Sequence, residues 1–362
     1  MIKIQGSVSK GWLHQTAGFK FDERYYFDPE YKWDQDHAID QYLDQRFAGY
    51  PICNIESNLG QIEHTLEKQI IVGGIQPNLI VGLAAGAKFF CDVDKDSDIE
   101  VRPLAQLIRI PDKLPTVAAL LESPLIKKFD AEIARLQATK PDYRIIPPYF
   151  WDTSGRATIH GFITTSMKLF GEDIFILMMD DPDLVRELHG WIADVYRGLI
   201  EHYSALANLP VTSVHVGECS GTMLSPDQYT QFIVPFANRM GQELGPLRWH
   251  SCGDSDHLLE PLSSVENLHI LDTGSKTNVS EVRAEFGEEF EINIAPPVDV
   301  LLERSDPEKI VTWLDEMLEG NNGGPLKIVH HMEPGYSLDT ILRIHDILDQ
   351  RNIAPKTRLT KG

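Results

Sequence analysis

Cysteine is scarce in this chain, with only four residues, at positions 53, 91, 219 and 252, among 362. They are too few and too scattered for a disulfide framework in a chain of this length. We therefore expect reduced thiols, at least one of which can serve as a metal ligand. No apolar run approaches the ~18–20 residues of a membrane span. The opening MIKIQGSVSKGW lacks the apolar core of a signal peptide, so a cytoplasmic protein is predicted.

Basic residues are also few, at 33 Lys and Arg against 54 Asp and Glu, for a formal net charge of −21. Such a surface excludes nucleic acid as a partner, because phosphate binding requires a basic face. The glycine-rich loops that bind dinucleotides or nucleoside triphosphates are absent too. The partners to expect are therefore a small molecule or another protein, and neither nucleic acid nor a membrane.

Short apolar runs alternate with helix signals through the second half of the sequence. Helix starts are indicated at Asp181-Pro182, at Ser225-Pro226-x-Gln228, which has a capping-box pattern, and at Ser337. A helix is also indicated over 37–48. The runs that read as buried strands are 143–149, 212–217, 247–252, 268–272, 290–294 and 326–331.

Alternation of this kind predicts an α/β protein with a parallel sheet and helical crossovers. Polar and sulfur residues stand at the ends of several different strands, which favours a closed (β/α)8 TIM barrel over an open sheet. We predict one domain over 1–362. Its first 50 residues are expected to form an irregular, aromatic N-terminal extension that packs on the barrel.

The sharpest local motif is Trp249-His250-Ser251-Cys252-Gly253 at the end of a predicted strand. Side chains two residues apart in a strand point to the same face, so His250 and Cys252 present a nitrogen and a sulfur together. A borderline-soft metal such as zinc prefers these ligands. Taken alone the motif is also compatible with a structural histidine beside a buried cysteine.

Two other strand ends carry candidate ligands for the same barrel mouth. Glu218 and Cys219 end the preceding strand, and the last strand ends in His330-His331-Met332-Glu333. Three strands that converge on one mouth suit a catalytic zinc site with three protein ligands and one open position.

The order and spacing of the motifs over 145–350 resemble the uroporphyrinogen decarboxylase superfamily. Within it, the His250-x-Cys252-Gly253 element resembles the zinc-dependent, corrinoid-linked methyltransferases, such as the methylcobamide:coenzyme M and O-demethylase enzymes. The other matching elements are Gly171-Glu172-Asp173, Asp180-Asp181-Pro182, Gly217-Glu218, Leu224-Ser225-Pro226, Asp272-Thr273-Gly274, Ala295-Pro296-Pro297 and Pro334 to Ile341.

The resemblance implies zinc held by His250, Cys252 and a third ligand near the last strand. His330 stands where those methyltransferases have a cysteine, with His331, Glu333 and Glu218 as alternative ligands. It also implies methyl transfer between a small methylated substrate, such as a methyl ether, or a thiol and cobalamin on a corrinoid protein. Glu218 is the predicted general acid/base.

The substrate pocket is predicted less sharply. Candidate substrate contacts are Tyr149, Trp151 and Trp249, with Asp272 and Asn293 as contacts or as partners of the ligating histidines. The alternative function is a metal-independent carboxy-lyase of the uroporphyrinogen decarboxylase type. The arginine-rich opening that such decarboxylases use is absent, with only Arg24 and Arg46 in its place. A monomer or a homodimer is expected.

Overall fold

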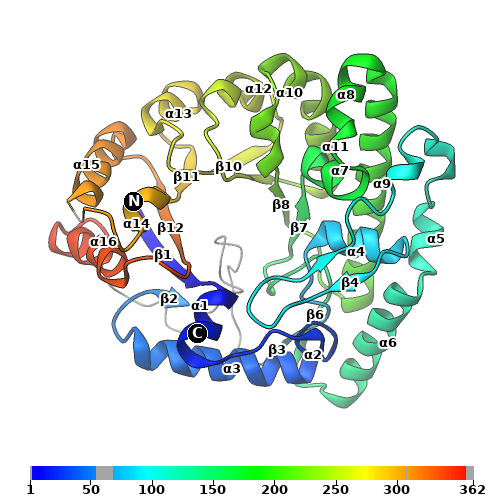
Figure 1. Ribbon diagram of the computed structural model, residues 1–362, viewed down its shortest axis with the longest axis horizontal. Coiled ribbons are helices and arrows are strands. Elements are labelled where there is room, and N and C mark those ends of the chain that lie inside the picture. Colours follow the sequence, from blue (N-terminus) through cyan, green and yellow to red (C-terminus); the bar gives the residue numbers. More distant parts are fainter. Residues whose placement is uncertain (1, 54–67, 307, 356–362) are drawn as a thin grey trace.

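Strands and helices alternate along the computed structural model, which describes residues 2–53, 68–306 and 308–355 (Figure 1). The strands are β1 (Ile2–Val8), β2 (Ile52–Cys53), β3 (Gln69–Ile71), β4 (Phe89–Phe90), β5 (Asp98–Ile99), β6 (Arg144–Ile146), β7 (Arg156–His160), β8 (Ser213–Gly217), β9 (Leu247–Ser251), β10 (Leu268–Thr273), β11 (Glu291–Ile294) and β12 (Leu326–Met332). The 3-10 turns are η2 (Ala105–Leu107), η3 (Pro111–Lys113), η4 (Cys219–Met223) and η5 (Asp256–Leu258). The helices are α1 (Lys10–Ala17), α2 (Glu23–Phe27), α3 (Pro29–Arg46), α4 (Pro77–Ala84), α5 (Val117–Leu121), α6 (Pro124–Thr139), α7 (Phe162–Phe170), α8 (Asp173–Asp180), α9 (Pro182–Ala207), α10 (Pro226–Phe232), α11 (Val234–Leu244), α12 (Leu259–Ser263), α13 (Val279–Phe286), α14 (Val298–Leu301), α15 (Lys309–Asn321) and α16 (Leu338–Gln350).

One parallel sheet of eight strands organises the molecule, in the order β2-β1-β12-β11-β10-β9-β8-β7. It curls, and most of the helices lie outside it (Figure 1). The predicted α/β class with a parallel sheet is thus confirmed. β3 pairs with β6, and β4 with β5, in two small separate sheets. Among the residues described, strand pairing leaves β2 and β7 as edges of the large sheet, so closure into a full barrel stays a prediction.

All six predicted strands overlap an observed one, namely β6, β8, β9, β10, β11 and β12. The three helix starts are confirmed as well. Asp181 accepts a hydrogen bond from the N–H of Leu184, and Ser337 accepts one from the N–H of Thr340. At α10 the capping box is complete in both directions. No helix in the described parts of the chain is long and apolar enough to cross a membrane.

The prediction of an irregular N-terminal extension is wrong. β1 lies inside the large sheet, paired in parallel with β12 from Ile2↔Leu326 to Val8↔Met332. The helix predicted over 37–48 is α3, which begins earlier because the Asp28 side chain caps it and Pro29 occupies its first turn. The run IKIQGSV is thus a strand that lies outside the predicted set, and its pairing with β12 extends over its full length.

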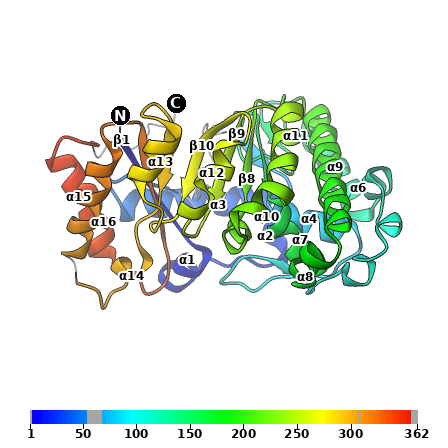
Figure 2. The same cartoon turned by 90° about the horizontal axis from the view of Figure 1, so that it is seen from above.

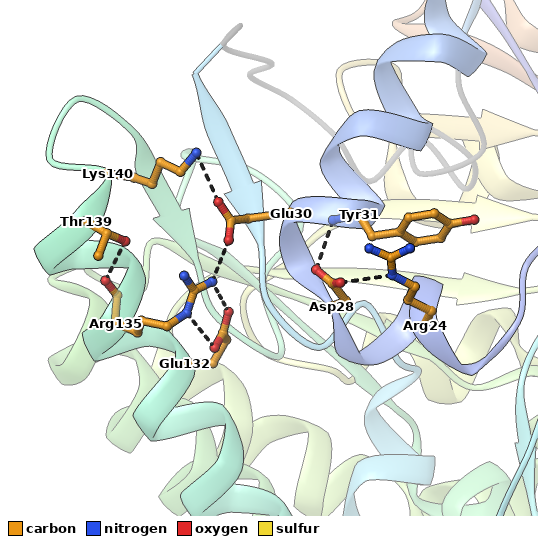
Figure 3. Close-up of polar contacts among 8 residues, drawn as sticks. All are labelled: Arg24, Asp28, Glu30, Tyr31, Glu132, Arg135, Thr139 and Lys140. Atoms are coloured by element: carbon orange, nitrogen blue, oxygen red, sulfur yellow. Dashed lines mark hydrogen bonds and ion pairs between the residues drawn. The ribbon is translucent and has the colours of Figure 1, made fainter.

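Ion pairs attach the N-terminal helices to the neighbouring layer (Figure 3). Glu30 of α3 lies 2.8 Å from Arg135 of α6 and 3.0 Å from Lys140, which follows that helix. Arg135 also pairs with Glu132 one turn earlier. These groups are partly exposed, so each pair contributes about 0–1 kcal/mol. Their role is to orient α3 against α6, and burial of the apolar side chains supplies most of the stability.

Side chains along each strand of the large sheet alternate between the concave inner face and the helix layer. On β9, Trp249 faces the helices and packs against Tyr229 of α10, with ring centroids 6.4 Å apart. Its neighbours Arg248 and His250 point inward, toward Asp272 of β10. The inner face therefore carries polar side chains, and the apolar core lies mainly between the sheet and the helices.

Because of His189 in α9, we expect the free energy of unfolding to fall at acidic pH. It is fully buried, and one ring nitrogen lies 2.9 Å from the carbonyl oxygen of Phe232. Burial lowers the pKa of His189 to about 4, from 6.5 for the free group. The folded state thus resists protonation, so the stability contribution is complete above pH 6.5 and is lost as the pH falls toward 4.

When the pH is lowered from about 8 to about 5, protonation of His189 in the unfolded state should lower the free energy of unfolding by about 2 kcal/mol. Replacing His189 with Asn, which can still donate to Phe232, removes the titrating group. Urea unfolding at both pH values should then show a pH-dependent loss that is smaller by about that amount. An unchanged loss would show that His189 does not control acid stability.

Candidate metal centre

Three potential ligands meet at the carboxyl ends of β8 and β9. His250 belongs to β9, Cys252 follows two residues later, and Cys219, two residues after the last residue of β8, begins η4. The Cys219 and Cys252 sulfurs lie 3.0 Å apart, and Nε2 of His250 lies 3.0 Å from the Cys252 sulfur. The three ligand atoms lie within 4.8 Å of one another. This confirms that His250 and Cys252 stand together and adds Cys219 to them.

Strand register explains why these residues meet. Gly217 of β8 is paired with His250 of β9, so Cys219 and Cys252 each stand two residues beyond a paired position. After Cys252 the chain turns close to β10, where a Cβ atom on Gly274 would lie 2.2 Å from the Cys252 carbonyl oxygen. Only glycine at position 274 permits this approach. The register of two strands and one tight turn therefore set the geometry of the site.

Behind the ligands, a buried carboxylate orients His250. Oδ2 of Asp272 lies 3.1 Å from Nδ1 of His250 and 2.7 Å from Nη2 of Arg248. Burial alone would lower the pKa of His250, but Asp272 and the two thiols outweigh it and raise the pKa well above 6.5. Asp272 lies within ion-pair distance of Nδ1, and Nε2 of the same ring contacts the Cys252 sulfur. The predicted partnership of Asp272 with a ligating histidine is supported by this contact.

The two thiols interact with each other and with His250, and these interactions change the pKa of Cys219 and of Cys252 in opposite directions. Hydrogen bonds from Cys252 and His250 lower the pKa of the Cys219 thiol, although burial acts in the opposite direction. The interaction with Cys219 raises the pKa of Cys252. A thiol whose pKa is lowered, with a second thiol sulfur 3.0 Å away, suits a cation that prefers sulfur ligands.

Glu218 points away from this cluster, into the start of α7. Its carboxylate accepts hydrogen bonds from the N–H groups of Ile163 and Thr164, at 3.1 and 2.9 Å, and from the Thr164 hydroxyl at 2.8 Å. Burial raises the pKa of Glu218 to about 7, against the lowering effect of these hydrogen bonds. The Thr164 hydroxyl oxygen also accepts from the N–H of Ser220. Glu218 therefore caps a helix and positions the loop that carries Cys219.

This placement changes the expectation for Glu218→Gln. The amide presents an NH2 group toward backbone N–H donors, so at least one hydrogen bond is lost in a buried place. We expect the free energy of unfolding to fall by about 1–3 kcal/mol, with a loosened Cys219 loop. Chemical denaturation of the variant measures the effect. A variant of unchanged stability with a large loss of turnover would instead identify Glu218 as an acid/base group.

The predicted third ligand, His330, lies elsewhere. It faces the helix layer, where Nε2 is 2.7 Å from Nε2 of His345 in α16, and a Cβ atom on Gly6 would collide with its ring. His331 faces inward but contacts Ser7 at 2.9 Å and Glu333 at 3.3 Å. Among the residues described, none of the three joins the ligand cluster. The prediction followed motif spacing, whereas strand parity turns His330 outward.

Three of the predicted substrate contacts lie far from the cluster or face away from it. Tyr149 is buried against Tyr196 and Tyr203 of α9, and Trp249 faces α10. Phe150 is bridged to Ala157, and the chain reverses direction between them at Gly155. Trp151 lies in this turn before β7 and therefore at the amino end of the sheet. A hollow of about 340 Å³ at that end is lined by Ser154, Arg156, Thr212, Ser213, Pro246, Leu247, Arg248, His269 and Ile270.

The remaining candidate, Asn293, is placed next to the site. It is paired with Asp272 across β10 and β11 and is buried. Within the described parts of the chain, its side-chain oxygen has no hydrogen-bond partner, and neither has Nδ1 of His215 or the hydroxyl of Thr158 on the same inner face. Buried polar atoms of this kind are rarely left unsatisfied, so they mark where water or a small polar ligand can bind.

Comparisons with known proteins agree with the fold. The model of the uroporphyrinogen decarboxylase family matches residues 160–346, which is just over half of the chain and includes all three cluster residues. No curated protein matches the sequence. Among solved structures, a methyltransferase from Methanosarcina mazei is similar, with a TM-score of 0.61 and 14% identity. That likeness covers 96% of this chain and 94% of the other.

Proposed function

Since this chain belongs to the uroporphyrinogen decarboxylase family, we propose that it is a zinc-dependent methyltransferase. The methyl group would move between a small methylated substrate, such as a methyl ether, or a thiol and a corrinoid carried by a partner protein. The single observation that carries the proposal is the cluster of Cys219, His250 and Cys252 at the strand ends. The fold shared with a Methanosarcina mazei methyltransferase adds support.

The donor set fits zinc. Two thiols and one imidazole, with ligand atoms within 4.8 Å, match a tetrahedral site that keeps one position for substrate. Bound zinc would lower the pKa of a substrate thiol or polarise a methyl ether oxygen. Two thiolates and a neutral imidazole balance the charge of Zn²⁺, so this site is less electrophilic than the predicted pair of histidines with one cysteine. The donor set therefore favours activation of a thiol.

The residues around the proposed metal ligands then have distinct roles. Asp272 fixes the orientation of His250, and Glu218 with Thr164 holds the loop of Cys219. Cys252 is exposed, so a ligand can approach the cluster from the mouth.

Apolar side chains exposed near the mouth support a protein partner. Ile176 and Met179 of α8, Met223 at the end of η4 and Val298 of α14 are all exposed. α8 and α14 lie along the same edge of the molecule as α1, which follows the carboxyl end of β1 (Figure 2). A corrinoid protein, with its flat and largely apolar ring, is the partner we propose for this rim.

Metal analysis combined with a methyl-transfer assay tests the function. The purified protein should hold one zinc per chain and catalyse methyl transfer from methylcobalamin to a small thiol such as 2-mercaptoethanol. Formation of cob(I)alamin is followed by its absorbance. Activity should disappear after chelation and return when zinc is added. Full activity in metal-free protein would contradict the proposal.

The metal-independent decarboxylase remains the alternative, and one observation speaks against it. Of the two arginines in the first 50 residues, Arg24 forms an ion pair with Asp28 at 3.1 Å and lies 4.2 Å from the centre of the Tyr31 ring (Figure 3). Incubation of the metal-free protein with uroporphyrinogen, with carbon dioxide release as the readout, separates the two functions.

A further inference from the structure

The two cysteines of the cluster lie unusually close for unbonded thiols. Their sulfurs are 3.0 Å apart, about 1 Å beyond the length of a covalent disulfide. Cys252 is exposed and Cys219 is partly exposed, so a small oxidant in solution can reach the pair. Most buried structural thiols lack this combination of closeness and access.

The backbone around the pair is compatible with a bond. β8 and β9 are neighbours in the parallel sheet, and such strands are about 4.7–4.9 Å apart. Cys219 and Cys252 each follow the paired residues Gly217 and His250 by two positions, which brings their sulfurs to 3.0 Å. The Thr222 hydroxyl donates to the Cys219 carbonyl oxygen at 3.1 Å, which holds the loop in place.

We propose that Cys219 and Cys252 form a reversible oxidation site, in which hydrogen peroxide converts the two thiols into a disulfide that excludes the metal. The inference rests on the same cluster as the proposed function, though not on methyl transfer. A disulfide removes two of the three ligands and leaves His250 alone. Bound metal, in turn, occupies both sulfurs and shields them from the oxidant.

The reaction balances in two steps. The sulfur of one thiol attacks a peroxide oxygen, the O–O bond breaks, and water leaves with a sulfenic acid formed on the cysteine. The sulfur of the second thiol then attacks that sulfenic sulfur, the S–O bond breaks, and a second water leaves. Two thiols and one hydrogen peroxide thus give one disulfide and two waters. A dithiol such as dithiothreitol reverses the modification by thiol exchange.

The experiment uses full-length protein with Cys53→Ser and Cys91→Ser, so that Cys219 and Cys252 are the remaining thiols. Metal-free and zinc-loaded samples are treated with an equimolar amount of hydrogen peroxide and examined by intact mass and peptide mapping. The metal-free sample should lose two hydrogen atoms in mass and yield a peptide pair linked through these cysteines. Zinc should slow the reaction at least about tenfold, and dithiothreitol should restore the mass and zinc binding.

Cys219→Ser in the same background is the control, and it should gain oxygen atoms instead of losing hydrogen. The proposal is overturned if the metal-free pair also gains only oxygen, or if zinc-loaded protein forms the disulfide as fast as metal-free protein. The result is separable from the proposed function. A protein that forms the disulfide but never binds zinc contradicts the metal site, whereas stoichiometric zinc with no disulfide contradicts only this inference.

Discussion

Cys252→Ala is expected to lower the affinity of the protein for zinc more than ~100-fold, because it removes one of three protein ligands. Even changes to residues that merely support a ligand typically cost 10–100-fold in affinity. Cys219→Ala and His250→Ala should have similar effects. Competition with a chromophoric chelator gives the affinity, and elemental analysis gives the stoichiometry.

Matched controls come from the histidines that the structure places outside the cluster. His330→Ala and His331→Ala should both retain stoichiometric zinc, because neither imidazole belongs to the group of three. His330→Ala is expected to lose stability, since it leaves a gap against His345 and Gly6. A loss of zinc in His330→Ala together with zinc retained in Cys219→Ala would restore the ligand set that the motif spacing indicates.

Asp272→Asn is expected to destabilise the fold by about 3–5 kcal/mol, because it removes the carboxylate from a buried ion pair. The carboxylate and the Arg248 guanidinium are almost wholly buried and 2.7 Å apart. Burial alone would raise the pKa of Asp272, but Arg248 and His250 lower it to about 2, which reflects their strong coupling to the charged form. Urea denaturation near neutral pH measures the loss, with Asp180→Asn on the exposed end of α8 as the control.

A double-mutant cycle separates the interaction energy of Asp272 with Arg248 from the cost of burying the Arg248 guanidinium without a carboxylate. Replacing Arg248 by Met as well should recover part of the stability lost in Asp272→Asn, because the double variant no longer buries a guanidinium without this carboxylate. The His250 ring also loses the contact that fixes its orientation, so zinc affinity should fall about 10–100-fold in Asp272→Asn. If the losses in the free energy of unfolding of the two single variants simply add in the double variant, Asp272 and Arg248 do not stabilise each other.

Much of the fold was predictable because its signals are local. The capping patterns at Asp181, Ser225 and Ser337 depend on a few consecutive residues, and each begins a helix as expected. Apolar runs marked β8 to β12 for the same reason. β1 and β7 are not among the predicted strands, and their places in the large sheet are set by parallel pairing with β12 and β8.

The candidate metal centre likewise contains residues that could be predicted from the sequence and residues that only the tertiary structure identified. His250 and Cys252 could be paired from the sequence alone, because alternation along one strand is a property of the backbone itself. Which strand ends approach each other was settled by the tertiary structure. The register of β8 against β9 brings Cys219 to the cluster, the outward parity of His330 sends it to α16, and the start of α7 captures Glu218. Register and parity depend on packing between segments far apart in the chain, so no local pattern of residues encodes them.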